Sequence, residues 1–503
     1  MAKSVDVLAF LVFSVSFALA FNFWGAITDV FQHYFGLVSE ADIVIGILSA
    51  RDHFEQRQTL RDTWVGNIQN DSNPIHRIIV KFLVGQEACS IPLDYREDPY
   101  SCKELNIGSH QSVPSKLRAM QVTECTGFTN QDQRFTGGTT GFDFKINHGI
   151  VIDKLGVYNM GDIVRPVKVT LFDTWRKEPI AISHFSSEQP GVLQDGFRYR
   201  PVEPYILPKD FEGTIVVEGL GHHSMQNENC MCTEEDGIGL ITIRQLIRSG
   251  DVTGGFPELT HRLVSSSLYP VGGNFIYHLH DPESLSLWHS NKEQQQREHI
   301  LKTEEETKRL EEELSVHNDL LLLDVTDTYR NLPKKVLLFY QWVDRTFSFN
   351  YVIKTDDDCF LNIHNILTGI KAKKLHRAKK TWWGNFRTSW AVQHNGKWSD
   401  LEYPCSGYPS FACGAGSLLT ADVVRWIAMN HVYLHSYQGE DVSLGIWLSA
   451  ILPYYDHDTK WVCDDTCDTG MYVSAEHKPN ELRTMWGNLV ECGDPCGCPG
   501  PIT

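Results

Sequence analysis

Residues 351–362, YVIKTDDDCFLN, join a short apolar run to three consecutive aspartates. The run 351–354 is typical of a buried β-strand, so the acidic residues directly follow the end of a strand. Three adjacent carboxylates repel one another, and they are costly at a buried strand end unless a cation neutralises them. In an extended segment Asp356 and Asp358 would point the same way, and carboxylate oxygens suit Mg²⁺ or Mn²⁺.

The aspartates at 356–358 have two interpretations. In the first they hold a divalent ion that bridges the two phosphates of a nucleotide, because open α/β sheets bind ligands at the carboxyl ends of their strands. In the second they form a solvated turn, since acidic triplets are common. The buried strand before them favours the metal site.

The segments around this stretch predict an α/β domain. A strand at 41–50 (ADIVIGILSA), a helix at 55–66 and a strand at 77–84 (RIIVKFLV) form a βαβ beginning, which indicates a parallel sheet with helices on its faces. Further elements follow in the second half of the chain: strands at 320–325 and 382–386, and helices at 334–346, 421–429 and 442–450.

Between these halves the pattern changes. No convincing helix occurs from residue 85 to 287, and residues 142–219 contain short runs of β-branched and aromatic residues separated by Gly, Pro and Asp. Such runs predict an all-β sandwich that is inserted into the α/β domain. The Glu/Gln/Lys-rich residues 291–317 predict a solvated helix, since they show no sustained heptad.

The composition narrows the class of protein. A length of 503 residues suggests several domains, and 42% hydrophobic with 21% charged residues excludes a disordered, fibrous or polytopic membrane chain. Asp and Glu number 63 against 45 Lys and Arg, a formal net charge of −18. A nucleic-acid partner is therefore not expected.

The N-terminus predicts entry into the secretory pathway. The uncharged run 7–27 is long enough to cross a bilayer as a helix, and Lys3 before it and Asp29 after it favour a cytoplasmic N-terminus. This describes a single-pass anchor. The alternative is a cleaved signal peptide, for which Ala18-Leu19-Ala20 supplies a small-residue cleavage site.

The cysteines agree with an oxidising compartment, since there are 13. Disulfides are expected near the C-terminus in preference to zinc, because no histidine completes a tetrahedral set at the usual spacing. The cysteines concerned are Cys463, Cys467, Cys492, Cys496 and Cys498. Cys405 and Cys413 are a further candidate pair, and Cys359 is a candidate buried free thiol.

A second acidic feature is Glu440-Asp441, at the beginning of an apolar helix. Carboxylates favour helix N-termini because they cap the first N–H groups and face the positive end of the dipole. The functional alternative is a general base that takes a proton from a hydroxyl group. Composition alone leaves both open.

Taken in this order, the motifs resemble glycosyltransferase family 31, the β-1,3-glycosyltransferases. The residues that carry the resemblance are Ser49, Arg57, Arg61, Thr63 and Trp64, then DVTDTYRNL (324–332) with Lys335, KTDDDCFLN (354–362), WWGNF (382–386), YPSFACGAGSLLT (408–420) and YQGEDVSLGIW (437–447). Leu60 departs from the family's usual Ile. The family-like parts cover residues 41–85 and 291–503.

The resemblance implies a GT-A fold, a Rossmann-like sheet with a metal-binding DxD sequence at a strand end. Mn²⁺ or another divalent cation would be ligated by Asp358 and by Asp356, which also faces the sugar and ribose hydroxyls of the donor. Asp357 would support the loop. His477 lies where many members place a metal-ligating histidine, and the alternative for it is a lone surface histidine.

The resemblance also assigns residues to the nucleotide pocket. Arg57 would approach the nucleotide, and Arg61 would either do so or form a structural ion pair. Asp327 and Asn331 would shape the pocket or serve the structure alone. Trp382, Trp383, Trp390 and Trp398 lie in segments on the presumed acceptor side, where they either stack on sugar or pack in the interior.

The implied reaction inverts the anomeric centre in a single in-line displacement, which needs one base. Asp441 is the expected base for the acceptor 3-hydroxyl, and Glu440 is the alternative base or a partner that binds acceptor hydroxyls. Gly414 and Gly416 suit a loop whose backbone closely approaches a ligand.

Phrases outside the family motifs resemble a branch that transfers N-acetylgalactosamine from UDP-GalNAc, in β-1,3 linkage, to β-linked N-acetylglucosamine of glycoprotein glycans, including O-mannosyl glycans. They are EDPYSCKELNI (97–107), FRYRPVEPYILP (197–208), GKWSDLEYP (396–404) and CGDPCGC (492–498). Two alternatives stay open: a transferase for galactose or N-acetylglucosamine, and a non-catalytic lumenal lectin or assembly partner.

The expected organisation has a cytoplasmic tail (1–6), a transmembrane signal anchor (7–27) and a short stem (28–40). A GT-A catalytic domain (41–85 and 291–503) is split by a β-sandwich (86–290) that is either lectin-like or a stem or dimer contact. This describes a single-pass type II protein of the Golgi or endoplasmic reticulum membrane, with the catalytic region in the lumen. Whether it forms a homodimer is left open.

Overall fold

The computed structural model describes residues 39–70, 76–107, 138–159, 161, 163–194, 196–220, 239–249, 256, 262–263, 272–393 and 396–498. The predicted tail, the anchor at 7–27 and most of the stem lie outside these residues. Within them, no helix combines the length and the apolar character that a membrane span requires.

The chain divides into two compact units. The first comprises Met1–Ala88, Glu306–Thr388 and Pro409–Thr503, and the second comprises Cys89–Glu305 and Ser389–Tyr408. The second unit therefore reaches beyond the predicted insertion at 86–290, since it also takes in the loop 389–408. Within that unit the amide of Gly396 donates to Glu212 Oε1 at 3.4 Å, a contact that sequence spacing does not reveal.

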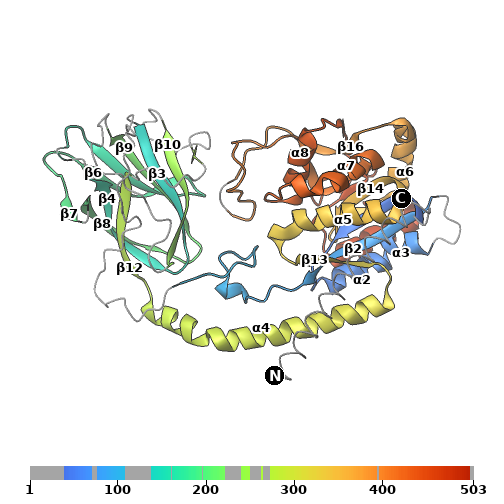
Figure 1. The fold of residues 1–503 in the computed structure, drawn as a ribbon, viewed down its shortest axis with the longest axis horizontal. Helices are drawn as coiled ribbons and strands as arrows, with labels where there is room; N and C mark the ends of the chain where they lie inside the picture. Colours follow the sequence, from blue (N-terminus) through green and yellow to red (C-terminus); the bar gives the residue numbers. More distant parts are fainter. Residues whose placement is uncertain are drawn as a thin grey trace, which may run out of the picture. The chain divides into compact units, whose positions relative to one another are not determined.

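A seven-stranded mixed sheet forms the centre of the first unit (Figure 1). Its order is β13 (Leu320–Thr326), β2 (Ile78–Glu87), β1 (Ser39–Leu48), β14 (Phe347–Asp356), β17 (Phe411–Thr420), β16 (Thr381–Arg387) and β18 (Tyr454–His457). The four strands from β13 to β14 are parallel, β17 is antiparallel to both of its neighbours, and β18 is parallel to β16. The predicted βαβ beginning is thus confirmed.

Helices cover both faces of this sheet because β1 is apolar on both of its sides. Ile43, Ile45 and Ile47 share one core cluster with Trp64. On the opposite face, Gly46 leaves room for Phe339, whose ring lies 2.5 Å from where a Cβ would be. The elements concerned are α2 (Phe54–Asp62) and α3 (Trp64–Gln69) on the first face, and α5 (Leu332–Thr346), α7 (Ala421–Asn430) and α8 (Glu440–Ser449) on the second.

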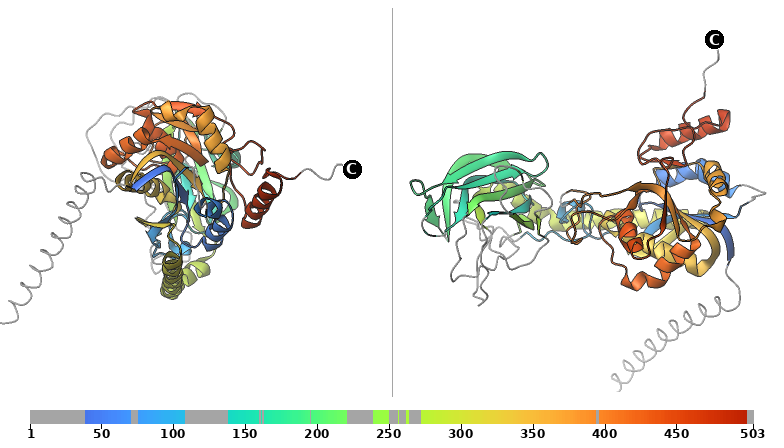
Figure 2. Two further views of the ribbon diagram at one scale, coloured as in Figure 1. Left: turned by 90° about the vertical axis from the view of Figure 1, so that its right-hand side faces the viewer. Right: turned by 90° about the horizontal axis from the view of Figure 1, so that it is seen from above.

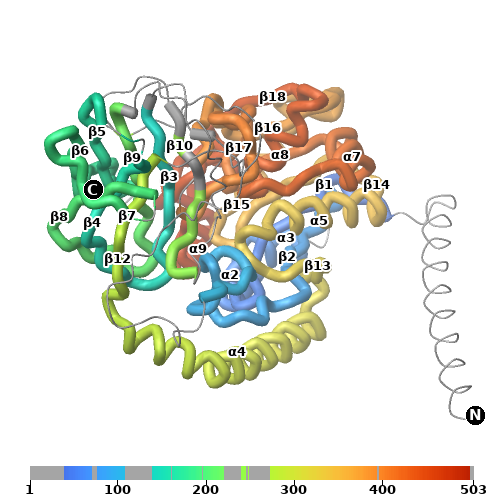
Figure 3. The backbone as a smooth tube through the Cα atoms, turned by 60° about the vertical axis from the view of Figure 1, so that its left-hand side comes forward, coloured from blue at the N-terminus to red at the C-terminus, as the bar shows by residue number. Residues whose placement is uncertain are grey.

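Helices α5 and α7 pack side by side, and α5 also contacts α8 (Figures 1 and 3). The remaining elements of the first unit are α6 (Ile363–Ala372), α9 (Pro479–Cys492) and a short ladder of β15 (Phe360–Leu361) with β19 (Val473–Ser474). Helix α9 packs against α2.

The second unit is built on two antiparallel sheets (Figure 2). One has the order β11 (Arg262–Leu263), β10 (Ile241–Ser249), β3 (Gly138–Ile146), β9 (Glu212–Leu220), β5 (Val167–Asp173) and β6 (Glu178–Phe185). The other has the order β12 (Gly273–Leu279), β4 (Ile150–Tyr158), β8 (Phe197–Leu207) and β7 (Val192–Gln194). One apolar core contains Phe144 from the first sheet and Phe275 from the second, which is the arrangement predicted for a sandwich.

Helix α4 (Pro282–Val316) is a single helix of 35 residues, longer at its N-terminal end than the predicted 291–317. Most of its side chains are exposed, as expected for a solvated helix. In the second unit Leu285 joins the core of the sandwich. In the first unit Glu313 is half-buried and takes part in an ion-pair network.

This network holds two arginines of α2. Arg57 has no exposed surface, and its guanidinium lies 2.8 Å from Glu313 while donating also to Ser49 Oγ at 3.0 Å. Arg61 binds Glu313 at 2.6 Å and Asp319 at 2.8 Å. Two buried cations thus share two carboxylates, which fixes α2 against α4 and the beginning of β13.

Four disulfides are formed by described cysteines: Cys89–Cys102, Cys413–Cys463, Cys467–Cys496 and Cys492–Cys498. The preference for disulfides over zinc is confirmed, and so is the buried free thiol of Cys359. The pairing of Cys405 with Cys413 is wrong, because Cys413 reaches Cys463 and Cys405 is exposed and free.

Replacing Glu313 by Ala should destabilise the first unit strongly, because it leaves Arg57 buried without its main counter-charge. Breaking one partner of a buried pair costs about 3 to 5 kcal/mol. Urea unfolding followed by tryptophan fluorescence would measure the change. Glu311→Ala is the matched control, because Glu311 is an exposed carboxylate two residues before Glu313 in the same helix.

The same comparison has a pH dependence. Burial alone would raise the pKa of Glu313, but hydrogen bonds and charges from Arg57 and Arg61 outweigh it and lower that pKa. A lowered pKa contributes stability that is present above the unfolded value and is lost as pH falls through the folded value. The difference in the free energy of unfolding between wild type and Glu313→Ala should therefore become smaller as the pH falls. An equal loss in Glu311→Ala at neutral pH would show that the network does not stabilise the unit.

Candidate functional site

The aspartate triplet lies at the carboxyl end of β14, next to the end of β1. Asp356 is the last residue of β14 and pairs in register with Leu48 of β1. The amide of Asp357 donates to the carbonyl of Leu48 at 3.1 Å, which holds the beginning of the loop. The antiparallel strand β17 places Gly416 opposite Thr355. The predicted position at a strand end is confirmed.

Lys354 connects the two acidic features of the sequence. Its Nζ lies 2.9 Å from Asp356 Oδ1 and 2.6 Å from Glu440 Oε1, and it also donates to the carbonyl of Gly414. The ammonium group is buried. Burial would lower the pKa of Lys354, but Asp356 and Glu440 outweigh it and raise the pKa well above its usual value, so this lysine is a permanent cation.

The carboxylates outnumber this one buried cation. Burial, together with the charges of Glu440 and Asp358, raises the pKa of Asp356 to about 7 against the attraction of Lys354. Burial and the charge of Asp357 raise the pKa of Asp358. Burial and the neighbouring carboxylates thus disfavour the ionised form of both aspartates, and a nearby positive charge would favour it.

The donor set fits a hard divalent cation. Single ligand atoms of Asp356, Asp358 and Cys359 lie within 4.8 Å of one another. Burial, with the charges of the two aspartates, raises the pKa of the Cys359 thiol well above its usual value, so the thiol stays protonated and is a poor ligand. The carboxylate oxygens are therefore the groups that would bind such an ion, and oxygen donors match Mn²⁺ or Mg²⁺.

Asp441 lies in the first turn of α8, directly after Glu440. Glu440 is buried and bound to Lys354, whereas Asp441 is half-buried and forms no ion pair in the described part of the chain. Its Oδ1 accepts from the amide of Val442 at 2.8 Å. Burial, and then the charge of Glu440, raises the pKa of Asp441 to about 7, which suits a general base near neutral pH.

Gly414 occupies the space between the two acidic features. A Cβ at this position would lie 3.3 Å from Glu440 Oε1 and 3.9 Å from Asp356 Oδ2. The expected loop is wrong, because Gly414 and Gly416 belong to strand β17. The backbone at Gly414 passes close to both carboxylates, and its approach to a ligand stays a prediction.

Asp357 is buried and turned toward the loop after β1. Its Oδ2 lies 2.8 Å from His53 Nδ1, and this hydrogen bond raises the pKa of His53 although burial opposes it. This position fits the expectation that Asp357 supports the loop.

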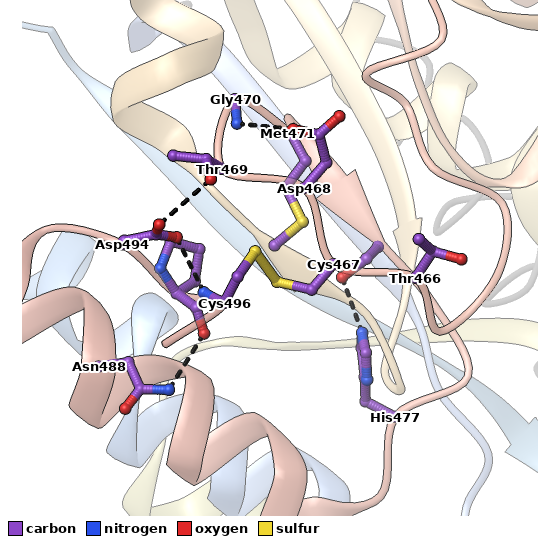
Figure 4. Close-up of a disulfide and its surroundings, with 12 residues drawn as sticks. Thr466, Cys467, Asp468, Thr469, Gly470, Met471, His477, Asn488, Asp494 and Cys496 are labelled. Atoms are coloured by element: carbon purple, nitrogen blue, oxygen red, sulfur yellow. Dashed lines mark hydrogen bonds between the residues drawn. A yellow bond between two sulfur atoms is a disulfide. The ribbon is translucent and has the colours of Figure 1, made fainter. Parts of the chain in front are cut away.

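His477 is close to the triplet through its backbone. Its amide donates to the carbonyl of Asp358 at 3.0 Å, and its Nε2 lies 2.7 Å from Ser474 Oγ. The side chain is only 8% exposed, so the alternative of a surface histidine is wrong. Burial lowers the pKa of His477, so the ring is neutral, as a metal ligand must be. Figure 4 shows it near the Cys467–Cys496 disulfide.

The predicted nucleotide residues outside the triplet bind protein partners other than this group of carboxylates. Arg57 and Arg61 are taken up by Glu313 and Asp319, so both are structural, and the expectation that Arg57 contacts the nucleotide is not supported by its full burial. All three guanidinium nitrogens of Arg57 donate to protein acceptors, and all three of Arg61 contact Glu313 or Asp319.

Asp327 and Asn331 shape the loop after β13. Asp327 accepts from Lys335 Nζ at 2.7 Å and from the amide of Gly85 at 2.9 Å, and Asn331 donates to the carbonyl of Thr326 at 2.8 Å. These bonds account for both side chains without a ligand, which corresponds to the structural alternative.

Lys354 is the residue that sequence reasoning missed. The signal was present: it is a charged residue in an otherwise apolar strand, two positions before Asp356 and hence on the same side. Of the four tryptophans, Trp382 and Trp383 are fully buried and pack in the interior. Trp390 and Trp398 are exposed, and they belong to the second unit.

Known proteins resemble this chain over most of its length. The family profile described as Galactosyltransferase matches residues 299–455. UDP-GalNAc:beta-1,3-N-acetylgalactosaminyltransferase 2 of Homo sapiens is 39% identical over 461 residues, which are 91% of this chain and 89% of the relative. The protein of the same name from Xenopus tropicalis is 37% identical over 95% of both chains.

A relative with a different name covers less of the chain. Beta-1,3-galactosyltransferase 6 of Mus musculus is 32% identical over 197 residues, which are 38% of this chain and 61% of that protein. Because the first relatives exceed 30% identity across both units, and the family profile covers β13, β14 and β16, this chain belongs to glycosyltransferase family 31, the galactosyltransferase family, and is a glycosyltransferase.

Proposed function

We propose that this enzyme transfers N-acetylgalactosamine from UDP-GalNAc, in β-1,3 linkage, to a terminal β-N-acetylglucosamine of a glycoprotein glycan of the O-mannosyl type. The observation that carries the proposal is the meeting of the aspartate triplet and Glu440-Asp441 around Lys354. The names of relatives that align across both units support the donor and the linkage. The galactosyltransferase aligns with a much smaller part of the chain.

In this proposal the first unit is a GT-A domain, and Asp356 and Asp358 hold Mn²⁺ with His477 as a further ligand. When bound, the cation acts as a Lewis acid that stabilises negative charge on the departing UDP. The raised pKa values of both aspartates support a cation here, because a bound cation would offset the cost of burying their charges.

The protein's own groups divide the remaining tasks. Lys354 fixes the carboxylate of Asp356 and neutralises Glu440, so that Asp441 is the unpaired carboxylate of α8. Asp441 accepts the proton of the acceptor 3-hydroxyl as that oxygen attacks the anomeric carbon from the face opposite UDP. One displacement with one base inverts the anomeric configuration, from α in the donor to β in the product.

A non-catalytic lectin or assembly partner is the other class of function. The presence and adjacency of every carboxylate that the reaction needs argues for catalysis. We propose further that the enzyme acts in the lumen of the Golgi or endoplasmic reticulum as a single-pass type II protein. The four disulfides support an oxidising compartment.

A donor panel tests the substrate assignment. The solubilised full chain with Mn²⁺ and a benzyl β-N-acetylglucosaminide acceptor should use UDP-GalNAc about ten-fold or more better than UDP-Gal or UDP-GlcNAc, by kcat/KM, because pocket contacts for one substituent contribute a few kcal/mol. Released UDP and the mass of the product would be measured. Preferred transfer of galactose would reject the assigned donor and leave the reaction class intact.

Asp441→Asn should lower kcat about 10²- to 10⁴-fold, because a general base contributes that much. UDP binding, measured by calorimetry, should stay close to that of wild type, since the asparagine keeps the shape of the site. Glu311→Gln, an exposed carboxylate-to-amide change, serves as the control. Near-normal turnover of Asp441→Asn would mean that another group is the base.

The pH profile of kcat should rise through about pH 7. The raised pKa of Asp441, about 7, leaves it protonated and unable to accept a proton below that value, and ionised above it. Rates would be measured with saturating substrates from below to above neutrality. The residual rate of Asp441→Asn should lack this rise, and a flat wild-type profile would count against Asp441 as the titrating base.

A further inference from the structure

Trp175 is a strongly exposed tryptophan in the second unit, as Trp398 and Trp390 are to a lesser degree. It lies in the turn between β5 and β6, and 61% of it is exposed, whereas Trp64, Trp382, Trp383 and Trp461 are fully buried. A large aromatic ring left in solvent forgoes the favourable burial that tryptophans normally have. Such a ring is available to stack on a ligand.

The position of this ring is fixed by its surroundings. The amide of Trp175 donates to Asp173 Oδ1 at 2.9 Å, which closes the turn. The six-membered part of the indole lies against Gly396, where a Cβ would be 2.5 Å from Cζ2. Gly396 has a φ of +72°, so glycine is required there for its backbone as well as for space. The exposed ring is therefore held in place by the loop 389–408.

A buried carboxylate converges on the same glycine. Glu212 is 6% exposed, and its Oε1 accepts from Arg244 at 3.1 Å and from the amide of Gly396 at 3.4 Å. Its Oε2 is buried and has no hydrogen-bond partner among the described residues. A bulge in β10 between Ile243 and Gln245 breaks the register at Arg244, whose side chain pairs with Glu212.

An unpartnered buried carboxylate oxygen is costly, and native proteins retain few of them. A hydroxyl group that reached Glu212 Oε2 would satisfy this oxygen. A wholly apolar partner would cover the ring and leave the oxygen without a donor, so the two features together select a ligand with an apolar face and hydroxyl donors. A pyranose ring has both: C–H groups on one face, which favour an aromatic π-surface, and hydroxyls around its edge.

We propose that Trp175, Glu212 and Gly396 form a carbohydrate-binding site that holds a pyranose unit of the acceptor glycan, separate from the residues that perform the transfer. Trp398, two residues after Gly396 in the same loop, is a second exposed tryptophan, with 55% of it exposed. The assignment of the sugar to the acceptor rests on the proposed function, whereas the site itself rests on the residues named here.

Binding of two disaccharides to the full chain tests the site without the transfer reaction. Chitobiose and mannobiose would be titrated in the absence of any UDP sugar, and saturation-transfer NMR would report the sugar protons in contact with the protein. At least one disaccharide should bind, and Trp175→Ala should weaken binding about ten-fold or more. Trp175→Phe, which keeps an aromatic face, should restore most of it.

Two further variants separate the carboxylate from general surface effects. Glu212→Gln keeps the shape of the side chain but replaces one acceptor oxygen by an amide donor, so disaccharide binding should weaken several-fold. The melting temperature of the variant would be measured as a check on folding. Val192→Ala removes an exposed apolar side chain elsewhere on the sandwich and should bind like wild type.

Binding of neither disaccharide to the wild-type chain, or equal binding by wild type and Trp175→Ala, would overturn the site. No UDP sugar is present, so a failure of the proposed transfer would leave this result unchanged. If the site also serves the acceptor, Trp175→Ala should raise KM for a glycopeptide acceptor several-fold while kcat changes little. A purely structural loss would instead lower kcat through a smaller active fraction.

Discussion

One buried ammonium group organises the active end of this enzyme. Lys354 follows the apolar residues Tyr351–Ile353 of β14, and it binds one carboxylate from each of two acidic segments that are more than 80 residues apart in sequence. Without it, Asp356 and Glu440 would repel each other across a narrow, poorly solvated space. With it, the site still carries more carboxylates than cations, and that remaining deficit is what a divalent metal ion would fill.

In the proposed reaction, the neighbouring carboxylates of Glu440 and Asp441 therefore have different roles. Glu440 is bound to Lys354, whereas Asp441, the next residue, forms no ion pair among the described residues. Burial and the charge of Glu440 raise the pKa of Asp441 to about 7. Two adjacent residues of the same chemical type thus differ in their partners, and this difference is what fits one of them to act as a base. The close packing of Gly414 against Glu440 allows the strand β17 to pass beside this arrangement.

The sequence was sufficient for features that depend on local pattern. Strand β14, the triplet at its end, the βαβ beginning and the β-sandwich follow from hydrophobic periodicity and from the spacing of turn residues. The ion pairs of Arg57 and the disulfide partner of Cys413 could not be predicted in this way, because both depend on which distant segment packs against these residues. Glu313 lies 256 residues from Arg57, and Cys463 lies 50 residues from Cys413. The same holds for the loop 389–408, whose Gly396 meets Trp175 and Glu212 only in the folded chain.

The central claim is that the carboxylates around Lys354 hold a divalent ion. Its most direct test is a titration of Mn²⁺ into the UDP-bound chain, with free Mn²⁺ followed by electron paramagnetic resonance. The account predicts one ion per chain, bound at least about ten-fold more weakly by Asp358→Asn and with unchanged affinity by Glu311→Gln. Equal binding by wild type and Asp358→Asn, or no binding by the wild-type chain, would contradict it.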